Sequence, residues 1–153
     1  MELVLVLIFV IAPISLLSHE LGHAIVAYQL RAHHISLQLG VGPLIYQKKG
    51  TTTDIMIRLL YFVGAMAIYE RNRPFSRKEQ AFISLGGPLA NGILAFLCIC
   101  LVYWVEMDGL YLFSGFNLWI AIINLLPFKW KERESDGYVV VKALYYLFVR
   151  PRG

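Results

Sequence analysis

The sequence has little charge: only 16% of its 153 residues are Asp, Glu, Lys or Arg, whereas 58% are hydrophobic. This usage, with a mean hydropathy of +0.62, excludes an ordinary soluble domain. Three stretches have almost no charge: residues 3–30 contain only Glu20, and residues 81–105 and 109–128 contain none. Each stretch is long enough to cross ~30 Å of hydrocarbon as a helix. We therefore expect a membrane α-helical fold in one domain, residues 1–153, with three transmembrane core helices.

Basic residues are absent from the short acidic loop between the second and third stretches, residues 106–108. All 14 Lys and Arg residues lie between the first and second stretches or after the third. The positive-inside rule then places the N-terminus and the acidic loop outside and the basic segments in the cytoplasm. The net charge of +4 is thus a topology signal, and we expect the bilayer as partner and no nucleic acid.

The beginning of the chain lacks the basic residues of a secretory signal peptide, and its apolar run is too long for one. We therefore read residues 3–30 as a span, with a cleaved signal as the alternative. Two shorter apolar stretches, residues 59–69 and 138–149, are too short to cross a membrane. We expect the first to be an interfacial or re-entrant piece and the second to be a short interfacial C-terminal helix.

Ionisable residues are rare in the spans, yet three of them stand together in His19-Glu20-Leu21-Gly22-His23. Histidines four residues apart lie on one face of a helix and can bind one zinc ion. Glu20 lies beside the first histidine, where a general base can take a proton from the attacking water. The alternative is a pair of core histidines beside a buried glutamate, but ionisable groups inside a membrane are costly and usually functional.

Two histidines leave a catalytic zinc one protein ligand short. Asp136 is the best candidate for the third ligand. Counted at ~1.5 Å per residue, Asn124 near the end of the third span lies at a depth similar to that of His19 in the first span, so the chain leaves the third span close to the histidines. Pro127 then breaks the helix, and a polar segment can turn back, with Gly137 allowing a close approach. An aspartate in a charged loop is otherwise simply solvated.

Other potential ligands are less favourable. His33 and His34 follow the first helix too closely, at its basic end, where solvated histidines are the ordinary case. Cysteine is scarce: Cys98 and Cys100 point to nearly opposite faces of the second span, so we expect packing residues and neither a disulfide nor a redox pair.

Residues 35–42 alternate apolar and polar side chains, and a second possible strand covers residues 51–59. We expect a β-hairpin after the first helix. Its exposed edge could bind an unwound substrate by strand addition, or the hairpin could merely plug the site. In the second span, Asn91 is an amide that needs a partner in lipid; it either faces the zinc site or only bonds a neighbouring helix.

Several motifs occur in an order that resembles the site-2 protease family of intramembrane zinc metalloproteases. They are HELGH at residues 19–23, a glycine-rich segment at 35–50, LGGPLANG at 85–92, NLLPF at 124–128 and SDG at 135–137. The chain departs from the family pattern in the long charged link FKWKERES before the aspartate.

The resemblance implies roles for individual residues. His19, His23 and Asp136 would bind Zn²⁺, the only cofactor we expect, and Glu20 would be the general base. Asn91 would hold substrate or stabilise the transition state, and Asn124 would shape the break before Asp136, close to the substrate.

We therefore expect a zinc-dependent endopeptidase that cleaves transmembrane or membrane-retained peptides, with its active site towards the cytoplasm of a prokaryotic cell. One alternative is a non-catalytic membrane scaffold that keeps the fold, although such a protein has no need of Glu20. Another is a zinc transporter, which would need polar lining groups that residues 3–14 lack.

Overall fold

The computed structural model describes residues 1–105 and 107–149 of the chain. The first long helix is continuous from Glu2 to Gln29 and consists of α1 (Glu2–Val6), a π-helical segment (Leu7–Ile11) and α2 (Ala12–Gln29). Two strands follow, then α3 (Arg77–Val102) and α4 (Asp108–Leu125). The chain continues with a short hairpin, β3 (Lys129–Trp130) and β4 (Arg133–Glu134), and α5 (Asp136–Phe148).

Three helices are long and apolar enough to cross a membrane: Glu2–Gln29, Arg77–Val102 and Asp108–Leu125. This agrees with the prediction of three long apolar helices, but their ends differ from the predicted 3–30, 81–105 and 109–128. α3 begins earlier because Ser76 caps it in a capping box with Glu79, a signal that hydropathy alone does not contain. α4 ends at Leu125 because Leu126, which precedes Pro127, is extended.

The sheet is larger than the predicted hairpin. β1 (His34–Lys48) and β2 (Thr53–Glu70) pair antiparallel, and both strands bend at glycines with positive φ, Gly40 and Gly42 in β1 and Gly64 in β2. Residues 34–39 thereby lie between residues 65–70 on one side and 53–57 on the other. The stretch 59–69, expected to be interfacial or re-entrant, is instead part of β2, because its backbone finds partners in β1.

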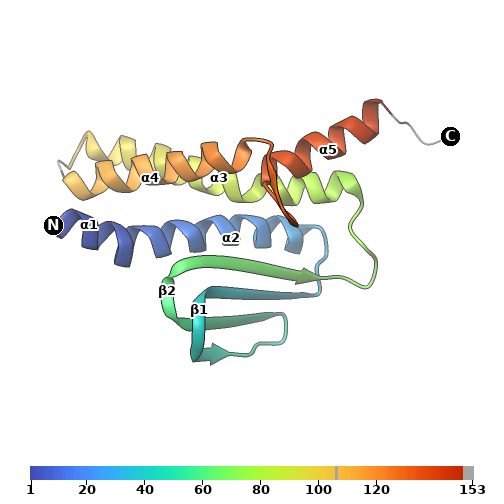
Figure 1. Cartoon of the computed structure of the whole chain (residues 1–153), viewed down its shortest axis with the longest axis horizontal. Coiled ribbons are helices and arrows are strands. Elements are labelled where there is room, and N and C mark those ends of the chain that lie inside the picture. Colours follow the sequence, from blue (N-terminus) through green and yellow to red (C-terminus); the bar gives the residue numbers. More distant parts are fainter. Residues whose placement is uncertain (106, 150–153) are drawn as a thin grey trace.

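The first long helix lies between the sheet on one side and α3 and α4 on the other (Figure 1). α2 crosses α3 closely: a Cβ atom on Gly22 would overlap the Gly86 carbonyl oxygen, and one on Gly86 would overlap that of Gly22. Small and branched apolar side chains fill the space between α2, the start of β1 and α3, where a buried cluster contains Ala24, Ala27, Ala32, Ile35, Leu37 and Ile83.

The stretch 138–149 forms most of α5, which has 13 residues and packs on α3 and α4. The predicted C-terminal helix is thus present, and its interfacial location stays a prediction. Because α5 follows directly on the β3–β4 hairpin, its first turn lies beside the end of α4 (Figure 1).

Candidate metal centre

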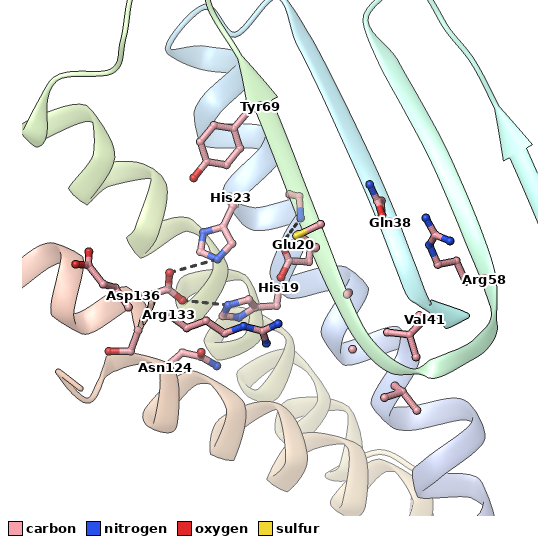
Figure 2. A pocket seen from close by; sticks show the side chains of 18 of the residues that line it. His19, Glu20, His23, Gln38, Val41, Arg58, Tyr69, Asn124, Arg133 and Asp136 are labelled. Atoms are coloured by element: carbon pink, nitrogen blue, oxygen red, sulfur yellow. Dashed lines mark hydrogen bonds and ion pairs between the residues drawn. The ribbon is translucent and has the colours of Figure 1, made fainter. Parts of the chain in front are cut away.

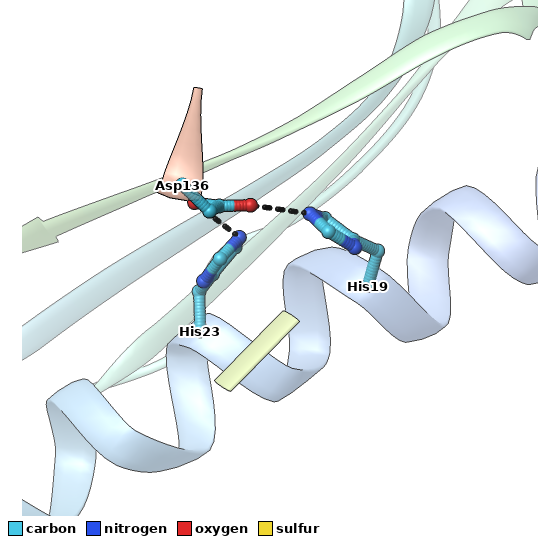
Figure 3. A group of neighbouring side chains, drawn as sticks. All are labelled: His19, His23 and Asp136. Atoms are coloured by element: carbon cyan, nitrogen blue, oxygen red, sulfur yellow. Dashed lines mark hydrogen bonds and ion pairs between the residues drawn. The ribbon is translucent and has the colours of Figure 1, made fainter. Parts of the chain in front are cut away.

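His19, His23 and Asp136 lie together although more than a hundred residues separate the aspartate from the histidines (Figure 3). The His19 Nε2 atom lies 3.1 Å from one carboxylate oxygen of Asp136, and the His23 Nε2 atom lies 3.5 Å from the other. One potential ligand atom from each residue lies within 4.8 Å of the other two. This is the only such group in the part of the chain that the structure describes.

Both imidazoles are oriented by hydrogen bonds at their other nitrogen. His19 Nδ1 lies 2.7 Å from Asn91 Oδ1, and His23 Nδ1 lies 2.7 Å from the backbone carbonyl oxygen of Ile83. When each Nδ1 donates its proton to these oxygens, each Nε2 keeps a lone pair directed at the space beside Asp136. Histidines that bind metals in proteins are held in this way.

A chain of buried amides continues behind His19. Asn91 Nδ2 donates to Asn117 Oδ1 at 2.7 Å and to the Ser15 carbonyl oxygen at 3.0 Å. Asn117 Nδ2 in turn donates to Ser15 Oγ at 2.8 Å. Asn91, Asn117 and Ser15 have no exposed surface, so the amide of Asn91 is fixed with its oxygen towards His19.

The expected contact of Asn91 with substrate stays a prediction. Its side chain is buried behind His19 and does not line the cavity described below. Its partners are helix residues and a histidine, so its direct effect is on the position of His19. Sequence reasoning missed Asn117 and Ser15; the available signal was an amide in the middle of an apolar span, which needs a partner.

Asp136 reaches the histidines because the charged link folds into the β3–β4 hairpin, which returns the chain to the end of α4. Ser135 closes this return: its hydroxyl donates to the Leu126 carbonyl at 2.7 Å, accepts from the Phe128 amide and caps α5 at Tyr138. Gly137 lies so close to α4 that a Cβ atom there would overlap the Leu125 carbonyl oxygen. The long link is therefore compatible with bringing Asp136 to the histidines.

Gly87 of α3 lies against the imidazoles. A Cβ atom at this position would overlap Nε2 of His23 and lie 2.7 Å from Nε2 of His19. Any larger residue would thus occupy the space in which the two nitrogen lone pairs converge. The sequence places this glycine in the LGGPLANG motif but gives no sign of its contact with the histidines.

Glu20 lies in a cavity of about 840 Å³ that also opens on His19, His23 and Asp136 (Figure 2). Its Oε2 atom accepts a hydrogen bond from the backbone N–H of Ala67 in β2 at 2.6 Å. Asn124 lines the same cavity and donates from Nδ2 to the Ile120 carbonyl oxygen of its own helix. The edge of β2 from residue 63 to 69 forms one wall of the cavity.

The charges around Asp136 favour its ionised form. Burial alone would raise the pKa of the Asp136 carboxyl, but contacts with His19 and His23, when these imidazoles carry a proton on Nε2, lower the pKa below the ordinary value of aspartate. A second carboxylate in the cavity wall, Glu134, has a lowered pKa because Lys142 binds it at 2.8 Å. Both carboxylates are therefore anionic at neutral pH.

The remaining candidates lie elsewhere. The His34 imidazole lies 3.5 Å from Asp54 beside the sheet, and His33 is exposed. Cys98 and Cys100 are free thiols in α3, and neither lines the cavity.

Comparison with known proteins links this geometry to a family. Three relatives have names that begin "Putative zinc metalloprotease": Rip2 of Mycolicibacterium smegmatis, YwhC of Bacillus subtilis and MJ0611 of Methanocaldococcus jannaschii. They are 28%, 29% and 28% identical to this chain over 87%, 86% and 90% of its length. The chain spans 56%, 65% and 72% of these relatives.

The family profile of "Peptidase family M50" matches residues 5–107, two thirds of the chain. The match includes the HELGH motif and the glycine- and asparagine-containing segment of α3. The chain therefore belongs to peptidase family M50, the site-2 protease family.

Proposed function

We propose that this protein is a zinc-dependent intramembrane protease that cleaves transmembrane or membrane-retained segments near the cytoplasmic face. The observation that carries the proposal is the position of Glu20, which shares one cavity with His19, His23 and Asp136. The names of the relatives support a metalloprotease, and the three long apolar helices support a membrane protein.

The donor set fits zinc. Two imidazole nitrogens and one carboxylate are a common ligand set of catalytic zinc, which keeps a further position open for water or substrate. The hydrogen bonds from His19 to Asn91 and from His23 to Ile83 leave Nε2 of both rings free for a metal. When bound, zinc would polarise the scissile carbonyl group and make water more acidic.

In this proposal Glu20 removes the proton from the attacking water and passes it to the leaving amine. The Ala67 amide holds one oxygen of its carboxylate at 2.6 Å, which limits the rotation of the side chain. Water can reach this depth because the cavity is partly polar and open. Asn124 lines the cavity and is available to contact substrate.

The substrate would bind along the edge of β2. Residues 65–70 pair with β1 on one side and have no strand on the other side in the described part of the chain. An extended peptide could add there as a further strand, which would expose a bond that a helix would shield. This geometry favours substrate binding over the alternative in which the hairpin merely plugs the site.

The distribution of basic residues supports a multi-pass membrane protein with the N-terminus outside and the site towards the cytoplasm. The organisms of the three relatives support a prokaryotic cell membrane. A non-catalytic membrane scaffold with the same fold is the competing function, and the experiment below separates the two.

The test combines zinc content with cleavage of a panel of co-expressed single-span membrane proteins. The wild type should hold about one zinc per chain, and His23→Ala and Asp136→Ala should lose it. Glu20→Gln should keep the metal and lose cleavage by a factor of at least about 100. Full cleavage by Glu20→Gln would overturn the role of Glu20 as general base, whereas a wild type that binds zinc and cleaves no peptide would favour the scaffold.

A further inference from the structure

Arg58 is a charged residue of the cavity that the proposed chemistry does not use. It lies in β2 opposite Leu44, at the bent end of the hairpin, and its side chain lines the same cavity as Glu20 (Figure 2). Its Nη1 atom donates to the Gly42 carbonyl oxygen at 2.9 Å. In residues 1–105 and 107–149 no carboxylate lies within 4.0 Å of its guanidinium.

The bent end of the hairpin reaches far along the first helix. Tyr61, three residues after Arg58, donates its hydroxyl to the Phe9 carbonyl oxygen at 3.2 Å, and Phe62 packs on the Phe9 ring at 4.9 Å between centroids. Phe9 precedes His19 by ten residues, or about 15 Å along a helix. Val41, Gly42 and Arg58 line the cavity at this bent end.

A guanidinium that lines the cavity and has no ionic partner in the described residues is available to bind an anionic ligand. An arginine can instead extend to the membrane surface, but the Gly42 contact keeps Arg58 at the bent end. Because Arg58 shares one cavity with Glu20, His19 and His23, a carboxylate carried by a peptide in that cavity is a better partner than a lipid phosphate. A guanidinium binds carboxylates through two parallel hydrogen bonds.

We propose that Arg58 is a specificity-determining residue that binds an acidic side chain of the peptide lying along the β2 edge. This inference rests on the proposed function, since it assumes that a peptide occupies the cavity. The preferred Asp or Glu should occupy one position, or two adjacent positions, of the bound peptide on the side of the cleaved bond that faces the bent end of the hairpin.

Arg133 is the other arginine in the cavity wall and could attract the same carboxylate. It comes from the β3–β4 hairpin, and its side chain extends to a position beside His19 (Figure 2). A carboxylate held by Arg133 would therefore lie close to the cleaved bond. The position of the acidic residue distinguishes the two arginines.

The experiment measures the affinity of the Glu20→Gln protein in nanodiscs for a series of single-span peptides. Each peptide carries one Glu, or an isosteric Gln, at successive positions of an apolar segment. At one position, or at two adjacent positions, the peptide with Glu should bind at least about tenfold more tightly than the same peptide with Gln, as expected for hydrogen bonds to a charged group. Arg58→Gln should abolish this ratio, whereas Arg73→Gln, which removes an exposed arginine outside the cavity, should keep it.

Charge reversal provides the second readout. Arg58→Glu should prefer a peptide with Lys at the same position, which a merely structural role of Arg58 would not produce. The inference would be overturned if the protein with Arg58 intact bound Glu and Gln peptides equally at every position. It would also be overturned if the preference for Glu disappeared only with Arg133→Gln. An effect of Arg58 that follows the anionic lipid content of the nanodisc and not the peptide would overturn it as well.

Cleavage of the same peptides by the protein with Glu20 intact keeps the two proposals separate. Glu-dependent binding without cleavage would leave the role of Arg58 standing and overturn the protease. Cleavage without a preference for Glu would leave the protease standing and overturn the role of Arg58.

Discussion

Gly87 determines how much space remains between the two histidine rings. A methyl group at this position would overlap one Nε2 atom and crowd the other, at the point where a metal must bind. We expect Gly87→Ala to lower zinc affinity about tenfold or more, because the ligands must move apart. Zinc titration in detergent would measure this loss, and Gly92→Ala of the same helix, which faces open space, is the control. Equal affinities for the two variants would contradict the assignment.

The buried amides behind His19 lead to a second prediction at the scale of single residues. Asn91→Leu removes the acceptor of the His19 proton and should weaken zinc binding about 10- to 100-fold. Asn117→Leu acts one bond further away and should have a smaller effect in the same direction. The measurement is the zinc dissociation constant of each variant.

Ser114→Ala is the matched control for these amides. Ser114 is buried in the same helix as Asn117 and donates to the Ala95 carbonyl oxygen, but it has no connection with His19. This variant should lose thermal stability and keep its affinity for zinc. If it weakens zinc binding as much as Asn91→Leu does, the amides act only through general stability.

At the scale of elements, the crossing of α2 and α3 determines where the histidines lie relative to α3. The helices approach so closely at Gly22 and Gly86 that each glycine faces the carbonyl oxygen of the other. Gly22 lies between His19 and His23 in the sequence, so a change in this crossing also moves the ligands. Small residues at helix crossings are a general means of close packing in membranes.

Gly22→Ala should therefore destabilise the protein by about 1–3 kcal/mol, the usual cost of an overpacked contact. Thermal unfolding in detergent would measure the change as a lower Tm. Gly115→Ala in α4 places the same methyl group in open space and should leave the Tm unchanged. A Tm for Gly22→Ala equal to that of the wild type would show that the helices can separate at no cost.

At the scale of the whole molecule, the distribution of basic residues predicts the orientation in the membrane. Met107, which belongs to the acidic loop of residues 106–108, is exposed in the structure. Lys131, at the turn of the β3–β4 hairpin, is also exposed. In a background with Cys98 and Cys100 replaced by alanine, a cysteine at Met107 should react with an impermeant reagent added outside whole cells. A cysteine at Lys131 should react only after permeabilisation. The reverse pattern would place the site on the outer side.

Sequence patterns of short range were sufficient for much of the molecule. His19 and His23 share a face because an α-helix repeats every 3.6 residues, and the long apolar runs indicated three long helices. Pro127 indicated the end of the third helix to within two residues. These features depend on neighbouring residues along the chain, so they can be predicted from a single sequence. The roles of the site residues stay predictions.

Only the tertiary structure showed which distant groups meet. The sequence suggested Asp136 as a third ligand, but its approach depends on a hairpin closed by Ser135 and on the contact of Gly137 with α4. The sequence did not predict the hydrogen bonds among Asn91, Asn117 and Ser15. It also did not predict the full length of β2. Each depends on packing between segments far apart in the chain, whereas helix periodicity and hydropathy report only what lies within a few turns.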